Sequence, residues 1–271
     1  STFLLMRLRI RWMRPRPATL LYLLRQSIPI ACAVSFVVVY QQLDAVLLGE
    51  LRQDGNAEVG WYRAGTKFLL VFTVLRESFL IAIYPVFASV AQSARERMSD
   101  LVTRAVRYQL IVAFFFILCF VFLPRMASKV LGQGFANTAE VLPIMAWILV
   151  PSTISITMGR VLVATGNQKR IMFATGLALL VNVALNLALI PRHGYKGAAV
   201  AGAMSEIAVA LANVYYVQRY VARTHIIRAV VRPIVAAAVV GVVLYRTPGL
   251  HLYQAVPLAG LLYAAGLLAL R

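Results

Sequence analysis

SIPIACAVSFVVVYQQLDAVLLG, residues 27–49, places a carboxylate and two amides at the end of a long apolar run. A helix of about 20 mostly apolar residues can cross the hydrocarbon core of a bilayer. A charged side chain at the centre of such a span costs roughly 2.5 to 3.5 kcal/mol, so it faces protein or water. We therefore predict a transmembrane helix whose polar face, with Gln41 and Asp44 three residues apart, points into a helix bundle.

Composition extends this prediction to the whole chain. The 271 residues are 61% hydrophobic and 13% charged, with a mean hydropathy of +0.80, whereas soluble domains are about 45 to 50% apolar and about 25% charged. We predict an all-α polytopic membrane protein with eight transmembrane helices. The low-charge windows are 27–49, 61–90, 106–124, 140–165, 170–191, 197–218, 230–246 and 252–270.

The positive charges indicate an orientation. With residues 1–26 in the cytoplasm, alternation of eight spans places seventeen of the 27 Lys and Arg residues on that side and six on the other. This asymmetry is typical of membrane proteins and predicts cytoplasmic N- and C-termini. The net charge of +18 is then explained by contact with anionic lipid headgroups, and nucleic-acid binding is not needed to account for it.

The expected organisation has three parts. Residues 1–26 form a basic cytoplasmic segment that begins with the end of a preceding helix. Residues 27–220 form a six-helix bundle, and residues 221–271 add two peripheral transmembrane helices with almost no polar side chains. Cys32 and Cys119 lie in separate apolar stretches, which excludes a disulfide framework.

No motif for covalent chemistry is found. His193, His225 and His251 lie in or near predicted loops without a metal-ligand spacing, and there is no glycine-rich phosphate loop, GxSxG or HExxH. We expect no enzyme activity, no metal and no cofactor.

Charges inside the predicted spans are the candidate functional residues. In the second span, Arg63 and Lys67 are four residues apart and share a helix face, with Glu77 about 40° from it. Asp44 ends the preceding span at a similar depth, so a pair with Arg63 or Lys67 is expected. The alternative for both cations is that they extend to the lipid headgroups.

The later spans add three further candidates. Arg160 follows Pro151 in the fourth span, where the proline is expected to kink the helix, and is either a headgroup anchor or an inner counterpart of the Arg63 cluster. Asn186 is four residues from Asn182 in the fifth span. Glu206 lies in the middle of the sixth span, as a buried acid bonded to Asn or Ser or as a proton-linked group.

Four stretches together resemble a known family. These are LLRQSIPIACAVSFVVVYQQLDAVLLGEL (23–51), EVGWYRAGTKF (58–68), YPVFASVAQS (84–93) and LNLALIPRHGYKGAAVAGAMSE (185–206). Over roughly residues 20–220 they resemble the second half of the polysaccharide biosynthesis flippases of the MOP (MATE-like) exporter superfamily. The resemblance implies the C-terminal bundle of a two-bundle transporter with a central cavity that alternates between inward and outward forms.

The cargo that this resemblance implies is an isoprenoid pyrophosphate-linked oligosaccharide, flipped across a bacterial or archaeal plasma membrane for surface polysaccharide export. Expected partners are membrane lipid, this substrate, and polysaccharide polymerases and glycosyltransferases. The substrate-binding candidates are Arg63, Lys67, Gln41, Arg160 and Asn186, and the candidates for ion coupling or structural pairing are Asp44, Glu77 and Glu206.

Other functions remain open from the sequence. An ion-coupled multidrug exporter favours acidic and aromatic cavities, whereas four of the seven intramembrane charges here are cationic. A membrane-embedded transferase is a further alternative. Because the related transporters have twelve to fourteen spans, a partial chain that needs its other half is the remaining alternative.

Overall fold

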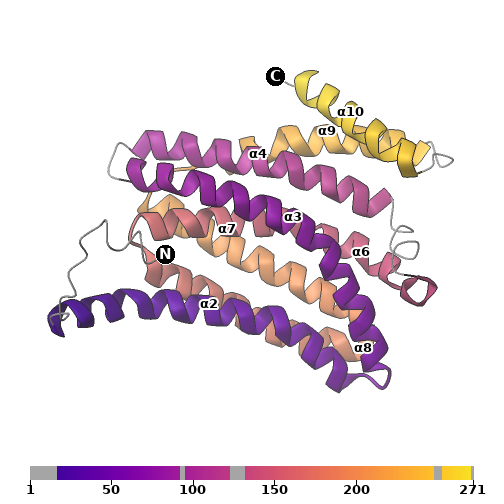
Figure 1. The fold of residues 1–271 in the computed structure, drawn as a ribbon, viewed down its shortest axis with the longest axis horizontal. Coiled ribbons are helices and arrows are strands. Elements are labelled where there is room, and N and C mark those ends of the chain that lie inside the picture. The colour runs from indigo at the N-terminus through magenta and orange to yellow at the C-terminus, as the bar shows by residue number, and fades with distance from the viewer. Residues whose placement is uncertain (1–16, 92–94, 123–131, 247–251, 270–271) are drawn as a thin grey trace, which may run out of the picture.

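The computed structural model describes residues 17–91, 95–122, 132–246 and 252–269, and all regular structure in these ranges is helical (Figure 1). The all-α prediction is thereby confirmed, whereas the expected end of a preceding helix at residues 1–16 lies outside the described residues. The elements are α2 (Pro17–Leu51), α3 (Gly55–Val90), α4 (Arg95–Phe122), the 3₁₀ turn η1 (Gln133–Phe135), α6 (Thr138–Ala146), α7 (Leu149–Ala164), α8 (Gln168–Tyr220), α9 (Ile226–Arg246) and α10 (Leu252–Ala269).

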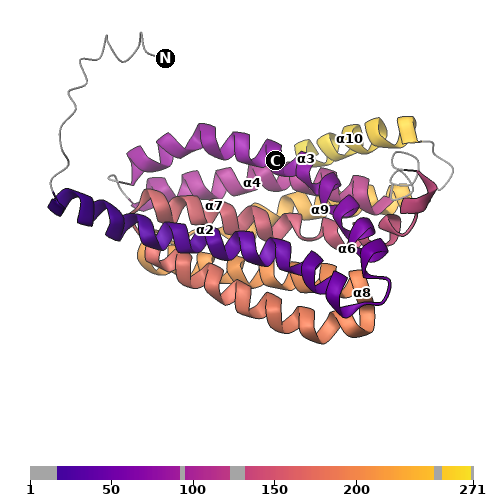
Figure 2. The ribbon, with the colours of Figure 1, turned by 60° about the horizontal axis from the view of Figure 1, so that its bottom comes forward.

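The 53-residue helix α8 is a hairpin of two arms, 168–193 and 195–220, joined at Gly194. Gly194 has φ 55° and ψ −138°, a combination that essentially only glycine adopts. The fold-back places Asn182 on one arm and Gly202 on the other beside the same α2 side chain, Asp44. Both arms lie along α2 in Figure 2.

A carboxylate holds the turn of this hairpin. Glu58, near the start of α3, accepts a hydrogen bond from the Tyr195 backbone N–H at 2.8 Å. Its other oxygen pairs with Arg52 Nε at 3.0 Å, and Arg52 also donates to the Pro191 carbonyl at 3.3 Å. The α2–α3 connection is thus fastened to the α8 turn by charge-assisted hydrogen bonds.

Helices α6 and α7 form one bent span, with an angle of 45° between them. The break falls at Trp147 and Ile148, so Pro151 lies in the first turn of α7. The kink expected from Pro151 is present at Trp147 and Ile148, because a proline disrupts the helix at the carbonyl four residues before it. A proline is tolerated in a first helical turn because its missing N–H would have no intrahelical partner there.

By length and composition, five of the described helices can cross a membrane, or six when the α6–α7 pair counts as one span. The protein is a multi-pass membrane protein. This count is lower than the predicted eight partly because the two arms of α8 are counted as one helix. Each arm is about 39 Å long at 1.5 Å per residue, which is enough to cross a bilayer. In α10, the described apolar stretch Val256–Leu268 is shorter than the other spans.

The packing is that of a bundle in lipid. Buried aromatic side chains fill the space between α3 and α4, among them Phe72, Phe87 and Phe114. Large apolar side chains such as Leu21, Ile81 and Leu180 are 69% exposed, as expected where hydrocarbon is the solvent. Helix α9 packs on α4, and α10 packs on α9.

Candidate functional site

A buried carboxylate network centres on Asp44 of α2, and Asp44 is 4% exposed. Asp44 Oδ2 accepts from Tyr62 Oη at 2.7 Å, and Oδ1 accepts from Asn182 Nδ2 at 2.9 Å and Asn186 Nδ2 at 2.6 Å. Asn186 Nδ2 also donates to Asn182 Oδ1 at 3.0 Å. A buried carboxylate with three neutral donors and no cation within ion-pair distance among the described residues is satisfied by hydrogen bonds alone.

A second buried carboxylate, Glu206, lies across the same α2 surface. Tyr40 is one turn before Asp44 on α2, and its hydroxyl donates to Glu206 Oε1 at 2.7 Å. Ser155 of α7 donates to Glu206 Oε2 at 3.2 Å, and Asn213 Nδ2 donates to the Ser155 carbonyl at 3.0 Å. These bonds tie α2, α7 and the second arm of α8 together.

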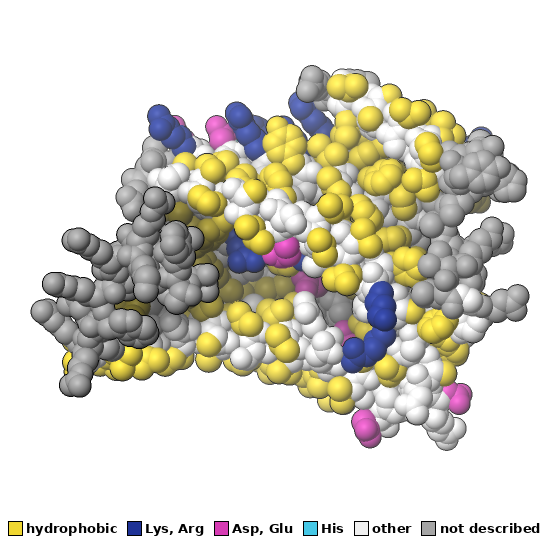
Figure 3. Space-filling model, viewed as in Figure 1, with side chains coloured by type: hydrophobic (Ala, Val, Ile, Leu, Met, Phe, Trp, Pro, Cys, Tyr) yellow, Lys and Arg dark blue, Asp and Glu magenta, His cyan; other side chains and the backbone are white. Residues whose placement is uncertain are grey.

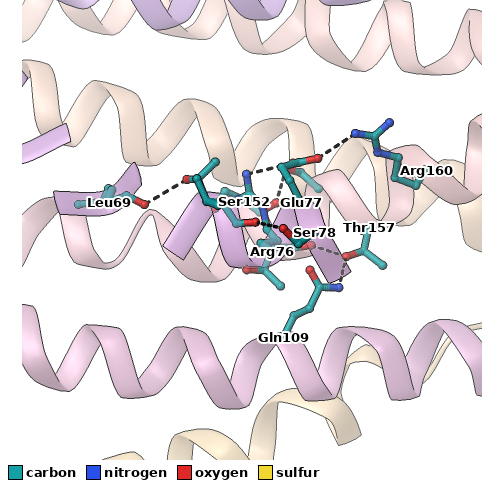
Figure 4. Close-up of polar contacts among 12 residues, drawn as sticks. Leu69, Arg76, Glu77, Ser78, Gln109, Ser152, Thr157 and Arg160 are labelled. Atoms are coloured by element: carbon teal, nitrogen blue, oxygen red, sulfur yellow. Dashed lines mark hydrogen bonds and ion pairs between the residues drawn. The ribbon is translucent and has the colours of Figure 1, made fainter. Parts of the chain in front are cut away.

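A chain of charges crosses from α3 to α7 (Figure 4). Glu77 lies between two guanidinium groups, with Arg160 Nη2 at 2.9 Å and Arg76 Nη2 at 3.5 Å. Arg76 is 7% exposed and donates to Ser152 Oγ at 3.0 Å. The Arg160 side chain is 44% exposed and the Glu77 side chain 31%, so a ligand can reach this ion pair, whereas Arg76 is buried.

Glu77 and Arg160 line a cavity of about 320 Å³ between α2, α3, α7 and α8. Its apolar wall comes mainly from α2, including Val34, Val37 and Val38. In Figure 3, charged side chains of both signs lie in a hollow in the middle of a largely hydrophobic face. The polar residues that line the cavity are Tyr40, Gln41, Glu77, Ser155, Arg160, Gln168, Thr175, Glu206 and Asn213.

The sequence profile of the MatE family matches residues 29–188, which include most of α2, all of α3, α4, α6 and α7, and most of the first arm of α8. The chain belongs to the MatE family. No curated protein matches the sequence.

Two solved structures share the fold of this MatE chain. The lipid II flippase MurJ, in an inward closed conformation, has a TM-score of 0.71 at 16% identity, over 98% of this chain and 57% of its own. A MOP superfamily transporter from Pyrococcus furiosus has a TM-score of 0.51 at 19% identity, over 81% of this chain and 52% of its own. The chain thus spans about half the length of the transporters that it matches.

The expected pair between Asp44 and Arg63 or Lys67 is wrong. Tyr62 faces Asp44, and Arg63 is the next residue, about 100° further around the helix. Arg63 Nη2 instead donates to Gln42 Oε1 at 3.1 Å. Both Arg63 and Lys67 are exposed, and neither lines the cavity.

The expected polar face of α2 is present, and the structure adds Tyr40 to it. Gln41 lines the cavity but is exposed, and the buried face carries Tyr40 and Asp44, which are four residues apart. Asn186 was expected to contact substrate, yet it is fully buried and bonded to Asp44. In this conformation Asn186 supports the carboxylate and has no surface for a ligand.

Other expectations about single residues fit the MatE bundle. Glu206 is a buried acid bonded to a serine, one of the two alternatives, and Glu77 forms an ion pair. Sequence reasoning missed Tyr40, Tyr62 and Arg76 as members of the networks. The spacing of four between Tyr40 and Asp44 was an available signal, whereas nothing in the sequence pointed Arg76 toward Ser152.

We expect Tyr40→Phe to destabilise this MatE bundle by about 1 to 3 kcal/mol, because it removes the donor that a buried carboxylate oxygen uses. Thermal unfolding of the purified protein in detergent measures the effect. Tyr245→Phe is the matched control, since Tyr245 is 77% exposed and should leave the transition unchanged. Equal transitions for the two variants would show that the Tyr40–Glu206 bond contributes nothing to stability.

Proposed function

We propose that the chain contributes one wall of a flippase for an isoprenoid pyrophosphate-linked oligosaccharide in a bacterial or archaeal plasma membrane. Membership of the MatE family and the fold shared with MurJ, itself a lipid II flippase, support a transporter of this class. The proposal includes a six-helix bundle at 27–220 and an accessory pair of helices at 221–271.

The supporting observation is the spread of cations along one polar face. Arg63 and Lys67 are exposed on α3, and Glu77, which holds Arg160, lies fourteen residues further along the same helix, about 21 Å away. An elongated anionic headgroup can contact cations at both ends of such a face. A compact anion would instead be bound by cations that lie close together.

Arg160 is suited to exchange partners. Its ion pair with Glu77 is part-exposed, and Glu77 keeps Arg76 as a second partner. A pyrophosphate can therefore replace Glu77 at Arg160 without leaving a carboxylate unpaired. The isoprenoid tail stays in the bilayer, so only the polar headgroup exchanges water for protein donors, and no covalent step is required.

We assign Asp44 and Glu206 to ion coupling or to bracing of the bundle. Each carboxylate joins α2 to α8 through neutral donors. Binding or release of a cation there changes the charge at the contact between these helices. Such a change can shift the balance between two packings of α2 against α8.

The exposed cations Arg63 and Lys67 of α3 predict a specific loss of transport. In a strain whose surface polysaccharide depends on this protein, the double variant Arg63→Ala and Lys67→Ala is expected to lower polymer output at least about tenfold, because each lost charge-assisted contact weakens binding of the phosphate. Membrane abundance should not change, since both side chains are exposed. Polymer is quantified on gels and the protein by immunoblot.

Arg192→Ala is the control, because it removes an exposed cation at the α8 turn. It should leave the polymer level unchanged. Normal polymer in the double variant would reject the proposed phosphate contacts.

An ion-coupled exporter of small amphipathic cations is the second candidate. A cavity of about 320 Å³ with two carboxylates, Glu77 and Glu206, and an apolar α2 wall is of a size for a small molecule. Efflux of a cationic dye from cells that produce the protein, lost in Glu77→Gln, would favour this function over the flippase.

A further inference from the structure

Residues 221–225 join α8 to α9 at the end of the bundle where α3 connects to α4 (left in Figure 1). Two cavities are lined in part by this segment. One, of about 1110 Å³, is lined largely by charged and polar side chains. The other, of about 590 Å³, is mostly apolar, with Leu211, Val214 and Ile227 in its wall. Gln218, Thr224 and His225 line both, so the two cavities form one amphipathic site, polar on one side and apolar on the other.

Thr224 lacks a hydrogen-bond partner at the boundary between the cavities. The residue is 7% exposed and its Oγ1 has no partner among the described residues. A buried hydroxyl without a partner is unfavourable, and a ligand that crosses the boundary can satisfy it.

The segment that carries Thr224 is held in place on α4. Ser99 Oγ donates to the Arg223 carbonyl, and the His225 backbone N–H donates to Thr103 Oγ1 at 3.3 Å. The connection between α8 and α9 is therefore anchored at both sides of Thr224. The site needs little rearrangement to receive a ligand.

The polar cavity presents charges of both signs. Glu96 and Asp100 of α4 and Arg219 and Arg223 near the end of α8 line it. All four are exposed, and none forms an ion pair with another described residue. Helix α9 begins beside the site at Ile226 and adds the positive end of its dipole.

We propose that this site binds a phospholipid with a phosphoethanolamine headgroup. The guanidinium groups and the α9 N-terminus receive the phosphate, and the two carboxylates receive the ammonium group. The acyl chains lie on the apolar wall. Phosphatidylglycerol has no cation for the carboxylates, and the methylated ammonium of phosphatidylcholine has no N–H to donate to them.

This lipid is a resident ligand, distinct from the proposed cargo, and it would pin α9 to α4 and α8. Its binding can be measured without any transport assay. The purified chain is titrated with phosphatidylethanolamine, phosphatidylglycerol or phosphatidylcholine of identical acyl chains, and bound lipid is counted by native mass spectrometry.

We expect about tenfold tighter binding of phosphatidylethanolamine than of either other lipid. The double variant Glu96→Gln and Asp100→Asn should reduce this ratio to about one, because amides lack the charge that attracts the ammonium group. The matched control, Glu50→Gln with Asp54→Asn, changes two exposed acids at the opposite end of α3 and should keep the preference.

A second measurement needs no variant. Phosphatidylethanolamine with a photoreactive acyl chain should cross-link to residues 210–228. Cross-links spread evenly over the lipid-facing helices would overturn the proposal. So would equal binding of the three lipids, selectivity that survives in the α4 double variant, or full competition by free phosphoethanolamine, which would make the site one for a soluble headgroup.

Discussion

Asp44→Leu is expected to prevent stable folding of the bundle. The substitution leaves three buried donors, on Tyr62, Asn182 and Asn186, without their acceptor. Each stranded donor costs about 1 to 3 kcal/mol, so a loss of about 3 kcal/mol or more is expected, a large share of a marginal stability. Membrane abundance and detergent unfolding measure it. Glu50→Leu, which replaces an exposed acid at the end of α2, should have no such effect.

Asp44→Asn separates stability from function at the same position. The asparagine carbonyl still accepts from the two amides, and its Nδ2 can donate to Tyr62 Oη, which is both donor and acceptor. We expect near-normal folding and, because a neutral amide cannot change charge, loss of the proposed transport. Full transport by a folded Asp44→Asn protein would show that the carboxylate only braces the helices.

Gly194→Ala is expected to break the α8 hairpin. A Cβ at this position would lie 2.2 Å from Glu58 Oε2, in a backbone conformation with φ 55° that side chains disfavour. Steric overlap and backbone strain act together at the one residue where the chain reverses. We expect strongly reduced membrane abundance and no cooperative unfolding transition.

Gly166→Ala is the matched control for Gly194. Gly166 also has a positive φ, 74°, but no described atom would lie within 4 Å of a Cβ added there. Gly166→Ala should lower the free energy of unfolding by only about 1 to 2 kcal/mol, because of backbone strain. Equal behaviour of the two single glycine variants would contradict this account of the turn.

Much of the fold could be predicted from the sequence because lipid imposes simple rules. Apolar runs of sufficient length mark the helices, and the gap between the windows 170–191 and 197–218 contains Gly194, where the two arms of α8 meet. The bend expected from Pro151 is present between α6 and α7, three to four residues before the proline. A proline shows that an N–H is missing, but only the contacts of the chain decide whether it stands inside a helix or just after a break.

The sites were harder to predict than the fold. Asp44 and Glu206 stood out because a carboxylate in an apolar helix is costly and must be satisfied. Their partners come from helices far apart in the sequence, with a sequence separation of 138 for Asp44 and Asn182 and of 166 for Tyr40 and Glu206. Electrostatic attraction suggested Arg63 as a partner for Asp44. The rotation of α3 placed Tyr62 there instead.

The sequence alone is enough to establish a bundle of apolar helices with a few polar groups that face inward. In hydrocarbon, backbone groups must bond within the helix, and charged side chains are costly unless they face protein or water. Which of those groups meet is settled in three dimensions. Arg76 at Ser152, Tyr40 at Glu206 and the unpartnered Thr224 depend on how each helix is rotated and how deep it sits. Packing of all the helices at once sets these two quantities, and no single stretch of sequence encodes them.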